Sequence, residues 1–271
     1  MTTVMGIVNV TPDSFSDGGR YLDTEAAIAH GRELLDEGAD ILDVGGESTR
    51  PGAAEVGAAE ETARVVPVIE ALASEGARMS VDTSKAEVAA AALAAGAEIV
   101  NDVTALGDPA MAAVCAEAGC GLILMHMKGT PRTMQEDPRY DDVVAEVRDF
   151  LAERLRVATA AGVDPERVWL DPGIGFGKTV EHNLELLARL GEIAALGSPV
   201  VVGTSRKNFI GVVTGREVGD RIGGSIATNV LALAGGASAL RVHDVAATVD
   251  AVRVAEPILR RSEPPAAEVG P

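Results

Sequence analysis

The sequence is poor in aromatic side chains and in positive charge. Aromatic residues make up only 3% of its 271 residues, so the core must be built from Val, Ile, Leu and Ala, as in parallel sheets covered by helices. The formal net charge is −18, and Lys and Arg form no block along the chain. Because phosphate backbones are held by clustered basic side chains, we expect no nucleic-acid partner.

Cysteines and long apolar runs are also scarce. The two cysteines, Cys115 and Cys120, form neither a CxxC motif nor a disulfide framework, which is typical of a reducing compartment. The N-terminus lacks the basic segment and the long apolar region of a signal peptide. No apolar run approaches the length of a membrane span. We therefore expect a cytoplasmic protein without membrane contact.

Short β-prone segments alternate with helical patterns along the chain. The strands are expected at 4–8, 40–44, 79–81, 98–100, 121–125, 168–170, 199–202 and 239–242, and the helices at 24–37, 59–74, 85–95, 109–118, 141–161, 181–190, 219–234 and 245–260. Most of these helices end on a glycine just before the next strand, so the αβ loops are short. The α/β pattern predicts a (β/α)8 TIM barrel with long loops after strands 1 and 2. A doubly wound sheet is the alternative.

The chain shows no linker that would divide it. A hydrophobic content of 47% is enough for one large core, and we expect a single barrel domain over residues 1–261. Residues 262–271 are rich in Pro, Ala and Glu and are predicted to be a disordered tail.

Polar residues follow all the expected strands, whereas the αβ loops are small. In a barrel these polar positions meet at the C-terminal rim, where the active sites of this fold lie. Any one of them could be a helix cap, but the full set indicates a site. The loop after Asn9 is long and rich in turn-forming residues, so it is a candidate active-site loop.

One set of rim residues suits a flat ligand rich in N–H donors, such as an aminopyrimidinone ring. Asp82, Asn101 and Asp171 follow strands 3, 4 and 6 and can accept several hydrogen bonds. Lys207 could donate to a ring oxygen or nitrogen. Alternatively, the buried carboxylates pair with Lys207 or Arg241 for structure alone.

A second set suits an anion. Arg241 and His243 follow the eighth strand and Ser205 follows the seventh, where barrels commonly hold phosphate. Mg²⁺ usually takes one or two protein oxygens together with substrate phosphates and water, so Asn9, with or without Asp13, would suffice as its protein ligand.

A series of motifs makes the chain resemble the dihydropteroate synthases of folate biosynthesis. In order they are NVTPDSFSDGG, DVGGESTRPGA, VDTSK, NDVTAL, LMHMKGTPRTMQ, LDPGIGFGKT, GTSRKNFIG and RVHDV. The resemblance implies a transferase that condenses (7,8-dihydropterin-6-yl)methyl diphosphate with 4-aminobenzoate, giving 7,8-dihydropteroate and diphosphate. It also implies sulfonamide inhibition and a homodimer formed through helices of the later half of the barrel.

The resemblance further implies a role for individual side chains. The pterin would be bound by Asp82, Asn101, Met125, Asp171, Phe176, Gly203, Lys207 and Arg241. The diphosphate would meet Asn9, Thr49, Arg241 and His243, with Mg²⁺ on Asn9 and Asp13. The 4-aminobenzoate would contact Thr11, Pro12, Phe15, Thr49, Arg50, Pro51, Ser205 and Lys207. The catalytic residues would be Asp13, Asp171, Lys207, Arg241 and His243.

These groups favour catalysis at the leaving group, because an arylamine is a poor nucleophile. Mg²⁺, Arg241 and His243 would neutralise the departing diphosphate, while the electron-rich dihydropterin would delocalise the cation left on its methylene carbon. An ionised Asp171 beside the pterin would favour that cation. We therefore expect a dissociative displacement, with the mobile loops ordering after the diphosphate binds.

Three other functions remain open. A methyltetrahydrofolate-dependent methyltransferase would use the same pterin-binding groups, but it needs no diphosphate site. A non-catalytic homologue would bind the pterin without turnover. A phosphate-binding lyase would use Lys207 as a Schiff-base amine.

Overall fold

The computed structural model describes residues 2–10, 20–48 and 55–262. Several predicted site residues lie outside this part of the chain: Thr11, Pro12, Asp13 and Phe15 of the first loop and Thr49, Arg50 and Pro51 of the second. Residues 263–271 of the predicted tail also lie outside it.

Parallel strands form one sheet in the order β6-β5-β4-β3-β2-β1-β8-β7. They are β1 Thr3–Asn9, β2 Ile41–Gly45, β3 Met79–Asp82, β4 Ala97–Asp102, β5 Gly121–Met125, β6 Val168–Asp171, β7 Val201–Val202 and β8 Ala239–Val242. The two ends of the sheet meet where the Leu170 N–H donates to the Pro199 carbonyl at 2.9 Å and Leu170 bridges to Val200. This closure confirms the predicted (β/α)8 barrel and excludes the doubly wound sheet.

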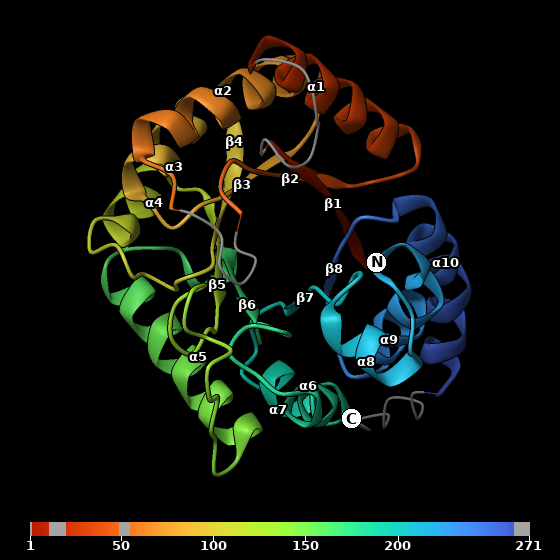
Figure 1. The fold of residues 1–271 in the computed structure, drawn as a ribbon. Helices are drawn as coiled ribbons and strands as arrows, with labels where there is room; N and C mark the ends of the chain where they lie inside the picture. The colour runs from red at the N-terminus through yellow and green to blue at the C-terminus, as the bar shows by residue number, and fades with distance from the viewer. Residues whose placement is uncertain (1, 11–19, 49–54, 263–271) are drawn as a thin grey trace, which may run out of the picture.

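The helices surround the strands (Figure 1). They are α1 Arg20–Asp36, α2 Ala58–Ser74, α3 Ala86–Ala94, α4 Met111–Ala118, α5 Val143–Ala160, α6 Val180–Ala188, α7 Gly191–Ala194, α8 Asn208–Thr214, α9 Ile222–Ala234 and α10 Val245–Ser262, with short 3₁₀ turns η1 Pro165–Arg167 and η2 Val218–Asp220. Within the described ranges, no helix is both long and apolar enough to cross a membrane.

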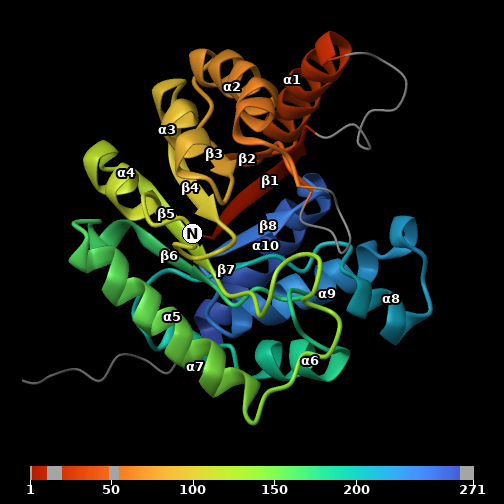
Figure 2. The same ribbon diagram turned by 60° about the vertical axis from the view of Figure 1, so that its left-hand side comes forward.

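The structure departs from the predicted elements in a few places. The short helices α7 and α8 are not predicted by the sequence pattern, and α8 lies beside α9 at the outer edge of the molecule (Figure 2). Helix α9 begins at Ile222 instead of 219, because η2 occupies the preceding residues. Helix α10 includes Ser262, which the sequence pattern assigns to the tail. The loop after β5, residues 126–142, is longer than the loops after β1 and β2.

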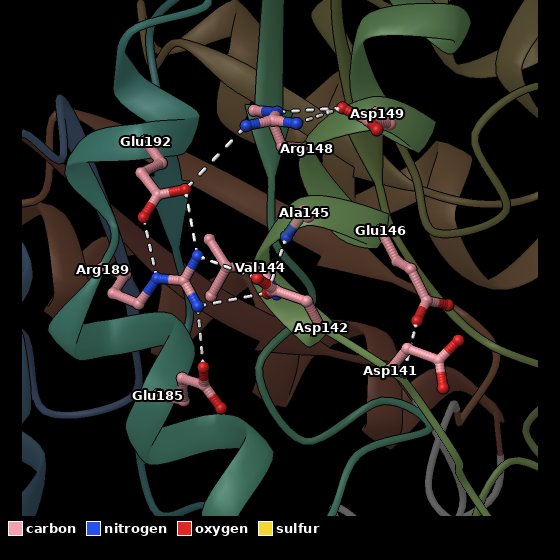
Figure 3. A network of polar contacts seen from close by, with 10 residues as sticks. All are labelled: Asp141, Asp142, Val144, Ala145, Glu146, Arg148, Asp149, Glu185, Arg189 and Glu192. Atoms are coloured by element: carbon pink, nitrogen blue, oxygen red, sulfur yellow. Dashed lines mark hydrogen bonds and ion pairs between the residues drawn. The ribbon is translucent and has the colours of Figure 1, made fainter.

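A network of charged side chains on the surface connects α5 to the neighbouring helices α6 and α7. Arg189, at the end of α6, contacts Asp142 at 3.1 Å, Glu185 at 2.8 Å and Glu192 at 2.8 Å. Asp142 also caps α5, accepting hydrogen bonds from the amides of its first turn. Figure 3 shows Arg189 at the centre of this network. The network ties the start of α5 to α6 and α7.

Candidate active site

The inner face of the barrel changes from apolar to polar over a single step along the strands. Its apolar layer consists of Met5, Ile41, Ile99, Ile123, Val201 and Ala239, with Trp169 packed against it. Because side chains on a strand alternate between its faces, the residue two positions later also faces the interior. That step leads to Asp43, Asn101, Met125, Asp171, Gly203 and Arg241, with Ile7 as the apolar member on β1, and Asp82 lies beside Asn101 in the β3–β4 register. The strand geometry therefore gathers the predicted pterin-binding residues into one polar layer.

Arg241 lies at the centre of this layer. Its Nε donates to Asp43 Oδ2 at 2.5 Å, and its Nη2 donates to Asp82 Oδ2 at 2.6 Å. The Asn101 amide donates to the same Asp43 oxygen at 3.0 Å. Two carboxylates thus fix the plane of the guanidinium, which leaves a flat cationic face. The ion pairing considered as an alternative for Asp82 is present in the structure.

The charges of this cluster do not balance, because it contains two carboxyl groups and only one guanidinium group. Burial raises the pKa of Asp82 to about 7, opposed by the charge of Arg241 and reinforced by those of Asp43 and Glu61. Burial alone would lower the pKa of Arg241, but Asp43 and Asp82 raise it above its ordinary value. Arg241 therefore stays charged, while burial makes the charged form of Asp82 less favourable than that of an exposed aspartate.

Asp171, Lys207 and Phe176 form a second group on the same rim. Asp171 is buried and accepts a hydrogen bond from the Gly173 amide at 2.7 Å. Burial raises the pKa of Asp171, while that amide and the charge of Lys207 oppose the rise. The Lys207 ammonium lies 3.8 Å from the centroid of the Phe176 ring, within cation–π range. Burial lowers the pKa of Lys207 to about 8, with the charge of Asp171 opposing the decrease.

Ser205 and Lys207 belong to a strained turn after β7. Arg206 between them has a φ of +57°, which few non-glycine residues adopt. The Arg206 guanidinium donates to the Asp244 carboxylate at 2.5 and 3.0 Å. The guanidinium of Arg221, at the N-terminus of α9, donates to the Arg206 carbonyl oxygen at 3.1 Å. Contacts from two other segments thus hold the turn in a conformation that its sequence alone would not favour.

His243 meets Ser205 at the rim. The Ser205 hydroxyl oxygen accepts from the His243 amide at 3.1 Å and lies 3.0 Å from His243 Nδ1. Its hydroxyl proton can be donated to Nδ1, which leaves the imidazole proton on Nε2. Burial, followed by the charges of Arg241 and Arg206, lowers the pKa of His243 to about 4. The neutral form of His243 is therefore favoured at pH 7, and it can donate a hydrogen bond from Nε2 to an anion.

Asn9 offers an amide oxygen at the mouth of the barrel. A Cβ atom on Gly45 would lie 3.8 Å from Asn9 Oδ1 and 3.7 Å from Asp82 Oδ2, so the two oxygens flank this glycine. In the part of the chain that the structure describes, no group of three or more His, Cys, Asp or Glu side chains could hold a metal ion. A Mg²⁺ ion at Asn9 would take most of its ligands from substrate and water, which suits the ordinary coordination of this ion.

The described candidate residues all lie at the C-terminal ends of the strands or in the loops that follow them. They are Asn9, Asp82, Asn101, Met125, Asp171, Phe176, Gly203, Ser205, Lys207, Arg241 and His243. Sequence reasoning gave no role to Asp43, although this residue holds both Arg241 and Asn101. Its position two residues after the buried Ile41 was the available signal, because that spacing places it in the polar layer.

The chain is similar over nearly its whole length to known proteins of one family. Residues 5–243 match the family described as pterin binding enzyme. A dihydropteroate synthase of Escherichia coli is 49% identical over 261 residues, which cover 96% of this chain and 93% of that protein. The dihydropteroate synthase of Mycobacterium leprae is 50% identical over 259 residues, covering 93% of this chain and 91% of that protein.

Solved structures give the same result. Xanthomonas albilineans dihydropteroate synthase with 4-aminobenzoic acid has a TM-score of 0.91 and 52% identity, covering 97% of this chain and 94% of that chain. The same enzyme in complex with 7,8-dihydropteroate has a TM-score of 0.87 and 50% identity, covering 97% and 95%. A Yersinia pestis enzyme in a sulfonamide drug complex has a TM-score of 0.90 and 45% identity, with the same coverage of 97% and 95%.

Proposed function

The chain belongs to the pterin binding enzyme family and, within it, to the dihydropteroate synthases, and from this premise we propose how its residues carry out the reaction. The enzyme is a transferase that joins (7,8-dihydropterin-6-yl)methyl diphosphate to 4-aminobenzoate and releases diphosphate. The observation that carries the assignment of roles is the polar layer around Arg241 and Asp171, directly above the apolar layer of the barrel. This arrangement supplies acceptors, a fixed cation and an aromatic wall on one rim.

In this proposal the pterin lies across the polar layer. Asp171 and Asn101 hydrogen-bond its edge, and Lys207 donates to a ring oxygen or nitrogen. The Phe176 ring and the guanidinium plane of Arg241 cover the flat faces of the pterin. The pocket is completed by Asp82, Met125 and Gly203.

The diphosphate lies at the mouth of the same pocket. Arg241 provides a permanent positive charge, and His243 donates a hydrogen bond from Nε2. Thr49 of the second loop adds a hydroxyl. Asn9 and Asp13 would hold Mg²⁺, which when bound supplies further neutralisation of the leaving group.

In this proposal the 4-aminobenzoate contacts residues of the first two loops and of the turn after β7. Ser205 and Lys207 form its described border. The remaining contacts come from Thr11, Pro12, Phe15, Thr49, Arg50 and Pro51, as the family resemblance implies. This arrangement places the arylamine nitrogen next to the pterin methylene carbon.

The reaction proceeds by dissociative displacement. The bond between the methylene carbon and the diphosphate oxygen breaks first, and its electron pair leaves with the diphosphate. The pterin delocalises the resulting positive charge, and Asp171 stabilises it as a carboxylate. The amine of 4-aminobenzoate then attacks the methylene carbon, and the proton it loses passes to the released diphosphate or to water. Positional isotope exchange within the diphosphate when the arylamine is omitted would support this order, whereas cleavage that strictly needs the arylamine would contradict it.

The direct test is diphosphate release by the purified protein with Mg²⁺, the dihydropterin diphosphate and 4-aminobenzoate, each omitted in turn. We expect release coupled to dihydropteroate formation and blocked by a sulfonamide. Tight pterin binding without product would instead identify a non-catalytic homologue.

We also propose a homodimer that packs through the later helices. Large apolar side chains are exposed on α8, η2 and α9: Val212, Val213, Val218, Ile222 and Leu231, each at least 45% exposed. Light scattering should give twice the monomer mass, and Leu231→Glu should lower it toward the monomer. A monomer at micromolar concentration would reject this proposal. The free, buried cysteines support the expected cytoplasmic location.

A further inference from the structure

The amino group of Lys178 is buried beside the site, and no step of the proposed reaction uses it. The residue is only 3% exposed. Its Nζ lies 2.9 Å from His126 Nδ1, 2.9 Å from the Gly173 carbonyl oxygen and 2.9 Å from the Phe176 carbonyl oxygen. A fourth acceptor, the His126 carbonyl oxygen, lies 3.4 Å away, so every donor of the amino group has an acceptor within reach, whether it carries three as an ammonium or two as an amine. Burial of a lysine is tolerated only when it is partnered in this way.

Burial and nearby charges lower the pKa values of both Lys178 and His126. Burial lowers the pKa of Lys178 to about 7, while the charge of Asp171 opposes the decrease and that of Lys207 adds to it. Burial, with the charges of Lys178 and Lys128, lowers the pKa of His126 to about 3. His126 is therefore neutral, and its Nδ1 is free to accept the hydrogen bond from Lys178.

Both carbonyl groups belong to the loop that carries the site residues after β6. The Gly173 amide donates to the Asp171 carboxylate, while the Gly173 carbonyl accepts from Lys178. The Phe176 carbonyl accepts from the same amino group, while its ring faces the Lys207 ammonium. One amino group thus fixes the backbone next to the pterin-binding carboxylate and the backbone of the aromatic wall.

The loop after β5 contacts this segment through further side chains. The Tyr140 hydroxyl donates to the Gly177 carbonyl at 2.8 Å, and the Gln135 amide donates to the Gly175 carbonyl at 2.9 Å. There is no space between the loops, because a Cβ on Gly173 would lie 1.9 Å from the His126 carbonyl oxygen. Lys178 therefore lies at a tightly packed joint between the two loops.

We propose that Lys178, with the Tyr140 hydroxyl as a second attachment, is a positioning residue for the pterin pocket. Its amino group holds Asp171 and Phe176 at the separation that the bicyclic ring requires. This inference rests on the proposed function, because it assumes that the pterin lies between these two residues. Lys178 itself makes no contact with the substrate in this arrangement.

Lys178→Met tests the proposal, because it removes the donors and keeps an unbranched side chain. We expect calorimetry to show that the variant binds 6-hydroxymethylpterin about tenfold more weakly, a usual loss when the support of a binding residue is removed. The Michaelis constant for the arylamine substrate should change by less than about twofold, since the hydrogen bonds of Lys178 go to His126, Gly173 and Phe176 and not to the turn after β7 that borders its site. Arg156→Met is the control. Arg156 is exposed on α5 and its guanidinium pairs with Glu153, so this variant should bind the pterin like the wild type.

The possible outcomes distinguish failure of the proposed function from failure of the positioning role of Lys178. A wild-type protein that forms no dihydropteroate would reject the proposed function, whatever the variants do. An active wild type with unchanged pterin affinity in folded Lys178→Met would overturn the positioning role, and so would equal losses of affinity for both substrates. If Lys178→Met does not fold by circular dichroism, Tyr140→Phe takes its place, because it removes a single oxygen. We then expect pterin binding to weaken about threefold, and an unchanged affinity would overturn the proposal.

Discussion

Arg241 determines which carboxylates of the polar layer are available to a ligand. Asp43 and Asp82 each contribute an oxygen to its guanidinium. Asp171 forms no ion pair within 4.0 Å among the described residues, and it is buried with a single amide donor on one of its oxygens. Asp171 therefore keeps an oxygen for the N–H groups of the pterin, and it is the carboxylate on which binding should depend most.

Asp171→Asn should lower kcat/KM for the dihydropterin diphosphate about a hundredfold, since hydrogen bonds to charged groups are roughly twice as strong as neutral ones and the cation loses its counter-charge. The melting temperature should stay equal or rise, because burial disfavours the charged form of Asp171 in the folded state. Steady-state kinetics and thermal unfolding measure the two effects. Asp149→Asn, at an exposed position on α5, is the control. Turnover near the wild-type level would show that Asp171 does not have this role.

His243 should titrate far below the ordinary histidine range in the free protein. Its pKa is lowered to about 4 by burial and by the charges of Arg241 and Arg206, so the unfolded chain binds a proton that the folded protein does not between about pH 6.5 and 4. The contribution of His243 to stability is therefore present above pH 6.5 and is lost as the pH falls through this window. Side-chain NMR titration checks the value, and a midpoint at or above 6.5 would contradict the neutral-donor role.

At the scale of elements, the loops after β5 and β6 act as one structural unit. Gly173, Gly175 and Gly177 have φ values of +65°, +84° and +62°. Their conformation alone would call for glycine. At Gly173 the neighbouring loop adds a second requirement, because its backbone leaves no space for a side chain. The glycines therefore serve the close packing of two loops as well as the turn itself.

Gly173→Ala should destabilise the protein by about 3 kcal/mol, combining left-handed backbone strain with overpacking. It should also abolish most pterin binding, since the carbonyl oxygen of His126 would have to move. Gly119→Ala is the matched control, because Gly119 has a φ of +60° and its Cβ would meet nothing within 4 Å. We expect this control to lose only about 1 kcal/mol. Urea unfolding compares the two variants, and equal losses would show that the fit between the loops adds nothing.

At the scale of the whole molecule, the strands of the barrel are least extensively paired at one seam, between β6 and β7. Strand β7 has two residues, and the described link to β6 is one bridge from Leu170 to Val200, just before β7, with the Leu170 N–H donating to the Pro199 carbonyl. By contrast, β1 and β2 pair over five positions. The seam lies next to the turn that carries Ser205 and Lys207. Part of the site therefore rests on the least extensively paired edge of the sheet.

Amide hydrogen exchange should be faster in peptides covering 199–203 than in peptides covering β1 to β5. Local opening is easiest where few backbone hydrogen bonds and contacts hold a segment. Mass spectrometry of exchanged peptides measures this difference, and a bound pterin should reduce it by adding contacts to Lys207. Equal protection of the amides in all strands from exchange would contradict the prediction that the seam between β6 and β7 opens most easily.

Much of this protein can be read from local patterns in its sequence. Strand and helix alternation follows from periodicity and glycine stops within each element. Residues such as Asp82, Asn101, Asp171 and Arg241 are recognisable because they lie at or just beyond the ends of apolar strands. The elements that the pattern misses, α7, α8 and η2, are only a few residues long, so they carry no clear periodic signal.

The partners of these residues depend on distant parts of the chain. Asp43 and Arg241 are 198 positions apart and meet only because β2 and β8 both flank β1 in the closed sheet. The charge state of His243 and the buried contacts of Lys178 likewise depend on neighbours brought together by the fold. The sequence by itself determined the elements, the rim and the family, because these are local properties. The tertiary structure alone decided which charges pair and which are left for the substrate, because pairing and burial are set across the barrel.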